Sequence, residues 1–131
     1  MNGKEKKRMT IWNRIKYDIL RKRAEWYKFP IIEITQGAID YFKDEVRGNS
    51  NKSDLEIIKK INRDFYSGQQ IHKDNGKLII AYGYLHIIYD KKLNIIYGIE
   101  NHNSYSYKKE GKINRDIRDK LNKLYGIKES K

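Results

Sequence analysis

Aliphatic residues alternate with tyrosines and histidines between residues 75 and 102, a pattern typical of consecutive antiparallel strands. We expect strands over 69–73, 77–90 and 93–100, and a weaker strand over 104–109. Asn75 and Gly76 form one of the strongest short hairpin signals, so we place the first turn there. The pattern therefore predicts an antiparallel sheet in this part of the chain.

The last hairpin is expected to fold about Lys91 and Lys92, which sets His86 opposite Tyr97. The two-residue period of a strand then assigns the side chains to two faces. One face is predicted to hold Ile79, Ala81, Leu85, Ile87, Tyr89 and Ile96. The other is predicted to hold Tyr82, Tyr84, His86, Ile88, Ile95, Tyr97 and Ile99. The second face carries most of the hydroxyl and imidazole groups, so we take it as the working surface.

Helical spacing of apolar residues predicts helices before and after the strands in the sequence. The first is a basic amphipathic helix over 9–28 that ends before Pro30. Its apolar stripe, which we expect to pack on the core, consists of Trp12, Ile15, Ile19 and Trp26.

Local capping signals place the other helices. Thr35 is expected to cap a second helix that ends near Gly48, and Ser53 with Glu56 opens a third that ends at Gly68. A last helix is expected over 112–125.

This order predicts an α+β fold, with N-terminal helices followed by an antiparallel β-meander of three to four strands and a C-terminal helix. We expect a single domain over 1–131. Its parts are a basic amphipathic helix over 1–30, a helical part over 31–68, the sheet over 69–109 and the C-terminal helix over 112–125.

Charge is the strongest compositional signal, because the 131 residues carry a net charge of +12. Residues 1–28 hold ten Lys or Arg against three acidic residues. Such a concentration of cations favours a polyanionic partner. The absence of cysteine excludes disulfides, thiolate catalysis and Cys-ligated metals, and the scattered histidines predict neither a metal nor a cofactor. No apolar run approaches the roughly 20 residues of a membrane span, so we expect a cytoplasmic protein without a membrane partner.

Two segments carry a resemblance to known proteins. The sequence IEITQGAIDYFKDEV, residues 32–46, resembles the opening of small phage and plasmid proteins with an IT-x-HA-x-x-RF pattern. The meander GYLHIIYDKKLNIIYGIENHNSYSY resembles the RelE-like toxins, and both groups are similar to metal-independent ribonuclease toxins. The resemblance implies an RNA-directed protein of a mobile genetic element. The histidine of the first pattern and the arginine beside the final histidine are absent, since Gln36, Gly37 and Asn103 stand there.

Metal-independent RNA cleavage needs a base, an acid and cations that stabilise the charged phosphorane. The catalytic candidates are His86, His102, Tyr97 and Glu100. Imidazole can donate or accept a proton near neutral pH, so His86 or His102 would act as base or acid. The alternative for each is a packing or solvated role without chemistry.

Single-stranded nucleic acid binds by stacking its bases on aromatic rings beside a basic groove. The candidate contacts are Tyr82, Tyr84, Arg14, Arg21, Lys22, Arg23 and Arg115. The alternative is that the tyrosines simply fill a half-buried sheet face.

The leading functional hypothesis is a nucleic-acid-binding protein of a mobile genetic element. If this protein is catalytic, it is expected to be a metal-independent ribonuclease toxin. The alternative is a non-enzymatic phage or plasmid inhibitor that binds nucleic acid or a ribonucleoprotein. RNA is preferred over DNA as the partner. A third hypothesis is a toxin-like or antitoxin-like protein whose first helix docks on a protein partner.

Overall fold

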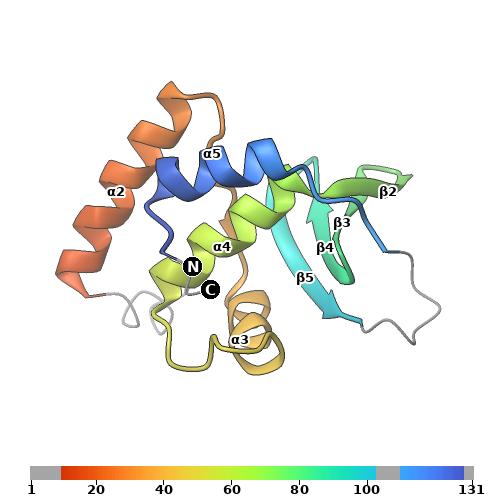
Figure 1. Ribbon diagram of the computed structural model, residues 1–131, viewed down its shortest axis with the longest axis horizontal. Helices are drawn as coiled ribbons and strands as arrows, with labels where there is room; N and C mark the ends of the chain where they lie inside the picture. The colour runs from red at the N-terminus through yellow and green to blue at the C-terminus, as the bar shows by residue number, and fades with distance from the viewer. Residues whose placement is uncertain (1–9, 103–109, 129–131) are drawn as a thin grey trace.

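The computed structural model describes residues 10–102 and 110–128, and these form four helices and a five-stranded sheet (Figure 1). The helices are α2 (Ile11–Trp26), α3 (Gln36–Glu45), α4 (Asp54–Ser67) and α5 (Arg115–Tyr125). The strands are β1 (Glu33–Ile34), β2 (Gln69–Asp74), β3 (Lys77–Tyr82), β4 (Leu85–Asp90) and β5 (Ile95–Asn101). The predicted α+β class is confirmed.

Capping residues fix the helix boundaries. The side chains of Thr35 and Ser53 accept hydrogen bonds from the backbone N–H groups three residues later, as the sequence predicts. Gly68 directly follows α4, also as predicted. The C-terminal helix starts later than residue 112, because the side chain of Asn114 accepts from the N–H of Ile117 and sets the helix start at residue 115.

The sheet has the strand order β1-β5-β4-β3-β2. Strands β2 to β5 form an antiparallel meander, as expected. The short β1 adds a fifth strand, which pairs in parallel with β5 through Glu33 with Ile95 and Ile34 with Ile96. The sheet is therefore mixed, and its β1 edge comes from the segment between α2 and α3. The strand predicted over 104–109 lies outside the described residues.

The continuous strand expected over 77–90 is wrong, because a tight turn at Gly83 and Tyr84 divides it into β3 and β4. Gly83 has a φ of +60°, in the left-handed region that favours glycine. Its backbone also exchanges hydrogen bonds of 3.1 and 2.7 Å with Gly111, which brings the segment before α5 against this end of the sheet.

The expected pairing of His86 with Tyr97 is also wrong, because His86 lies opposite Glu100. The carboxylate of Asp90 accepts two backbone N–H groups of the β4–β5 turn, and Asn94 in that turn has a φ of +55°. A bulge follows and leaves Tyr97 without a direct partner on β4. The longer turn and the bulge together shift the register.

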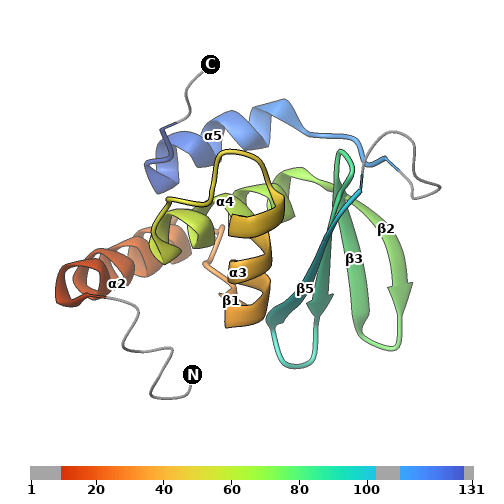
Figure 2. The same ribbon diagram turned by 90° about the horizontal axis from the view of Figure 1, so that it is seen from below.

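The helices gather on one side of the sheet (Figure 2). Ile87 of β4 and Ile96 of β5 are fully buried in a core that they share with Ile57 and Ile61 of α4. This register corrects the predicted faces. Tyr82 and Ile99, predicted to share a face with His86, pack on the helical side instead. Ala81, predicted on the opposite face from His86, lies beside it on the side away from the helices.

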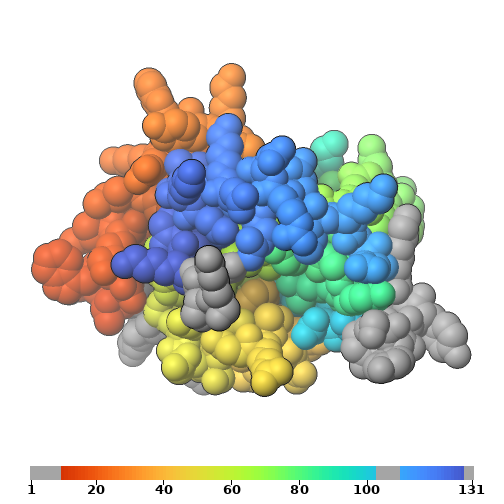
Figure 3. Space-filling view, in the orientation of Figure 1, coloured from red at the N-terminus to blue at the C-terminus, as the bar shows by residue number. Residues whose placement is uncertain are grey.

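A second core holds α2 against α4 and α5. Leu20 and Ala24 are the buried residues of α2, and they pack in a cluster with Leu121 and Tyr125. The predicted packing stripe is wrong, because its four residues face solvent and the side chains of α2 project from one edge of the molecule (Figure 3). The exposed fractions are 73% for Trp12, 46% for Ile15, 61% for Ile19 and 82% for Trp26.

Among the described helices, none has the length and apolar character needed to cross a lipid bilayer. Tyr17, Ile31 and Tyr66 contact both cores and so connect them.

Candidate functional site

A basic cavity of about 480 Å³ opens where α3, α4 and α5 meet the turn end of β3 and β4. Within the described residues, one carboxylate lines it, that of Asp64. The cations that line it are Arg47, Lys52, Lys60, Arg63, Arg118 and Lys128. Opposite charge is scarce, so the cavity is an electropositive site suited to anions.

A buried ion pair forms the inner wall of this basic cavity. Arg63 donates from Nε to Asp64 Oδ1 at 2.9 Å, and its Nη2 lies 2.8 Å from the same oxygen. The Nη1 atom of Arg63 donates to Asn122 Oδ1 at 3.1 Å. Residues 63 and 64 are 5% and 2% exposed, so the pair depends on these bonds to offset its desolvation. It holds the inner wall in one geometry.

Tyr82 joins this wall to α5, because its hydroxyl accepts a hydrogen bond from Arg118 Nε. The guanidinium carbon of Arg63 lies 5.8 Å from the centroid of the Tyr82 ring. Burial raises the pKa of the Tyr82 hydroxyl, and the Asp64 charge raises it further, whereas the two arginines lower it. The hydroxyl therefore stays protonated near neutral pH.

The outer rim consists of a loop and the β3–β4 turn. Buried Asn49 donates to the backbone carbonyls of Val46 and Arg47 and accepts from Lys60 Nζ at 2.7 Å, which orders the loop that carries the exposed cations Arg47 and Lys52. Tyr84 lines the cavity from the turn and is half-buried.

The predicted cations of α2 lie elsewhere. Arg14 and Arg21 line a second cavity of about 450 Å³, together with the carboxylates of Asp18, Glu33 and Asp54. Its mixed charge makes this second cavity a weaker anion site than the basic cavity. The other predicted contacts line neither cavity and are exposed: Lys22, Arg23 and Arg115.

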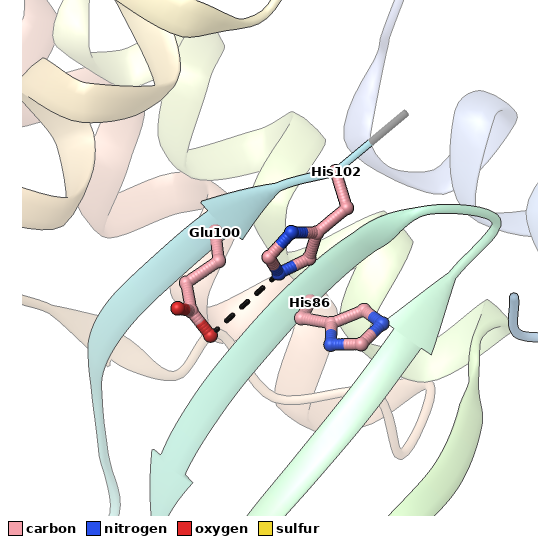
Figure 4. Close-up of side chains that lie close together, drawn as sticks. All are labelled: His86, Glu100 and His102. Atoms are coloured by element: carbon pink, nitrogen blue, oxygen red, sulfur yellow. Dashed lines mark ion pairs between the residues drawn. The ribbon is translucent and has the colours of Figure 1, made fainter. Parts of the chain in front are cut away.

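Three predicted catalytic residues form a histidine cluster on the sheet face away from the helices (Figure 4). His86 lies directly opposite Glu100, and His102 follows Glu100 by two residues, which places it on the same face. The ring centroids of the two histidines are 4.8 Å apart, with an interplanar angle of 70°. The potential ligand atoms of all three residues lie within 4.8 Å of one another.

The environment within the histidine cluster is uneven. His86 is 4% exposed, whereas Glu100 has an exposed side chain. His102 Nε2 lies 3.8 Å from Glu100 Oε1 and is buried without a hydrogen bond to the part of the chain that the structure describes. A buried polar atom left in this state costs about 1–3 kcal/mol, so the atom calls for an explanation. Tyr97, the fourth predicted catalytic residue, is 45% exposed and lies outside the cluster.

The basic cavity and the histidine cluster lie on opposite faces of the sheet. Tyr82 and Leu85 present the cavity side, and the next residue, His86, presents the cluster side. The cations of the cavity suit a phosphate group, and the side chains of the cluster are of the kinds that transfer protons or ligate a metal ion. The two do not face one another, so the imidazoles are not aimed at an anion inside the basic cavity.

The sequence interpretation missed Arg63, Asp64 and Arg118, as well as the other cations of the basic cavity, Arg47, Lys52, Lys60 and Lys128. A signal for the first two does exist, because adjacent opposite charges stand within the apolar pattern of α4 between Ile61 and Phe65. Arg118 has no comparable local signal, because its partner Tyr82 lies 36 residues away in sequence.

Comparison with known proteins shows no relative: no family model, curated protein or solved structure matches this chain. The resemblance to RelE-like toxins and the docking of a protein partner on α2 both stay predictions.

Proposed function

We propose that this protein binds single-stranded nucleic acid, with RNA as the preferred partner, in the basic cavity. The observation that carries the proposal is the cavity lining, in which cations outnumber the single carboxylate of Asp64 among the described residues. That carboxylate is already paired with Arg63 at the inner wall. The remaining cationic lining is a match for the phosphates of a nucleic-acid backbone.

The cavity has the size for part of a strand. Its volume of about 480 Å³ falls within the roughly 300–1,000 Å³ of sites for small organic ligands, so it would hold only one segment of a chain. The rim cations Arg47 and Lys52 are exposed and would contact neighbouring phosphates. The net charge of +12 adds a long-range attraction for the polyanion.

Tyr84 is the ring best placed to stack on a base, because it lies at the cavity mouth on the β3–β4 turn and is half-buried. Stacking of one base on an aromatic ring contributes about 1–3 kcal/mol. Tyr82 has a different role in the proposal. Its hydroxyl is bonded to Arg118 and its ring faces Arg63, so it supports the wall that positions the cations.

The proposal is for binding rather than cleavage. A cleavage site would need His86 or His102 next to the bound phosphate, but these residues lie on the sheet face opposite the basic cavity. The preference for RNA, and an origin in a mobile genetic element, follow from the resemblance to ribonuclease-like toxins. We therefore expect RNA to be bound intact.

Fluorescence anisotropy with a labelled single-stranded RNA tests this function. We expect the double variant Arg47→Glu, Lys52→Glu to lose most of its affinity at low salt. The matched control is Lys91→Glu, Lys92→Glu, which makes the same charge change at exposed positions of the β4–β5 turn. Equal losses in the two variants would show that net charge alone drives binding, and they would refute the cavity. Recovery of shortened RNA in the presence of chelator would refute binding without cleavage.

A further inference from the structure

We propose that His86, Glu100 and His102 form a binding site for a divalent transition-metal ion, with Zn²⁺ as the ion. The site lies on the sheet face away from the helices and the basic cavity, and it is independent of nucleic-acid binding. The sequence does not predict it, because its histidines are 16 residues apart and only the β4–β5 pairing brings them together.

The strand register builds the site. His86 and Glu100 are direct cross-strand neighbours, and His102 is the next residue on that face of the chain. Their potential ligand atoms lie within 4.8 Å of one another, and His102 Nε2 is 3.8 Å from Glu100 Oε1. Zinc–ligand bonds of about 2.0–2.2 Å place tetrahedral ligands about 3.3–3.6 Å apart. Small side-chain rotations therefore suffice to close the set around one ion.

A second observation points to a ligand at the same place. The Nε2 atom of His102 is buried and makes no hydrogen bond within the described residues, although its Glu100 neighbour is 3.8 Å away. Its ring meets the His86 ring edge-on (Figure 4). A metal ion bound between these residues would give the buried nitrogen the partner that it lacks.

The donor set selects the class of ion. Two imidazole nitrogens and one carboxylate oxygen suit zinc and other first-row transition metals, whereas Mg²⁺ and Ca²⁺ prefer oxygen ligands alone. Zinc commonly takes three protein ligands with a water in the fourth position. The exposed side chain of Glu100 leaves a route for the ion and for that water on the solvent side.

Isothermal titration of Zn²⁺ into chelator-treated protein tests the site, with any histidine tag removed beforehand. We expect the protein to bind one equivalent of Zn²⁺ saturably. Glu100→Gln and His102→Gln should each weaken Zn²⁺ binding at least about tenfold. This is the lower end of the loss caused by removing a residue that only hydrogen-bonds to a metal ligand. His72→Gln is the matched control, because His72 is an exposed histidine on β2 and should be dispensable. Co²⁺ should give the visible absorption of a nitrogen and oxygen site in the wild type and lose it in Glu100→Gln.

Absence of saturable Zn²⁺ binding would overturn the proposal and leave a plain ion pair between Glu100 and His102. Unchanged binding in Glu100→Gln, or an equal loss in His72→Gln, would also overturn it. Circular dichroism without metal checks that each variant is folded. If His102→Gln is not folded, Glu100→Gln alone tests the metal site. RNA binding should be the same in Glu100→Gln as in the wild type, so failure of the metal site and failure of the basic cavity are separable.

Discussion

Arg118 of α5 donates a hydrogen bond from Nε to the hydroxyl of Tyr82, which lies 36 residues earlier on β3. This bond ties the C-terminal helix to the end of the sheet at the wall of the basic cavity. Arg63 of α4 faces the same tyrosine ring at 5.8 Å. Tyr82 is therefore the residue through which two arginines from different helices are held at one site.

Tyr82→Phe should destabilise the protein by about 1.5–3 kcal/mol, because hydrogen bonds to charged groups contribute more than neutral ones. Urea unfolding monitored by circular dichroism measures the change in the free energy of unfolding. Tyr97→Phe is the control, since Tyr97 is 45% exposed, and it should change stability by less than about 0.5 kcal/mol. Equal effects at the two tyrosines would contradict the structural role of the Arg118 bond.

Two glycines should respond oppositely to alanine. A Cβ at Gly111 would lie 2.0 Å from the backbone oxygen of Ala81, so Gly111→Ala should cost about 1–3 kcal/mol or more through forced backbone movement. Gly37 lies in α3, where no atom of the described residues comes within 4 Å of such a Cβ, so Gly37→Ala should stabilise the fold by about 0.4–1 kcal/mol. Thermal unfolding of both variants checks the signs. A tolerated alanine at position 111 would show that the segment before α5 does not cross the sheet at Ala81.

Adjacent residues of α2 should differ sharply in their effect on stability. Leu20 is 6% exposed in the second core, and Leu20→Ala should cost about 2–5 kcal/mol. Ile19 is 61% exposed, and Ile19→Ala should cost less than about 0.5 kcal/mol. Chemical denaturation of the two variants measures the difference. A larger stability loss in Ile19→Ala than in Leu20→Ala would instead support the packing stripe that the sequence predicts.

Stability should fall at alkaline pH. Burial raises the pKa of Tyr66 from 10.0 to about 12, with a smaller electrostatic contribution from Tyr89. Burial also raises the pKa of Tyr125, with a smaller electrostatic contribution from Tyr66. The folded state therefore binds more protons than the unfolded state above pH 10, so stability is complete below pH 10 and declines as pH rises toward 12. Melting temperatures at pH 8, 10 and 11 should show this decline. In Tyr66→Phe the decline should be shallower, and an identical slope would contradict the assignment to Tyr66.

Local signals in the sequence predict the helices well. Thr35 and Ser53 cap helices because their side chains bond to backbone groups three residues away, and such contacts need no tertiary information. The Asn75 and Gly76 turn is equally local, and both residues have positive φ values. The α+β class follows from the same signals.

Nonlocal contacts explain most of the errors. The register that places His86 opposite Glu100 depends on a bulge and on the Asp90 turn, which alternation of apolar residues does not reveal. Which side of α2 is buried depends on how the helix packs against α5. The buried residues of α2, Leu20 and Ala24, are smaller than its exposed tryptophans. The sequence could therefore identify His86, Glu100 and His102 as candidates for chemistry, but not the basic cavity assembled from three helices.

The salt dependence of RNA binding tests the central claim, the basic cavity, most directly. Each phosphate contact on a single strand contributes about 0.7 to the slope of log affinity against log salt concentration. If both rim cations contact phosphates, Arg47→Glu, Lys52→Glu should reduce the magnitude of that slope by about 1.4, the sum for two contacts. The control Lys91→Glu, Lys92→Glu should keep the wild-type slope. An unchanged slope in the Arg47 and Lys52 variant would contradict nucleic-acid binding in the basic cavity.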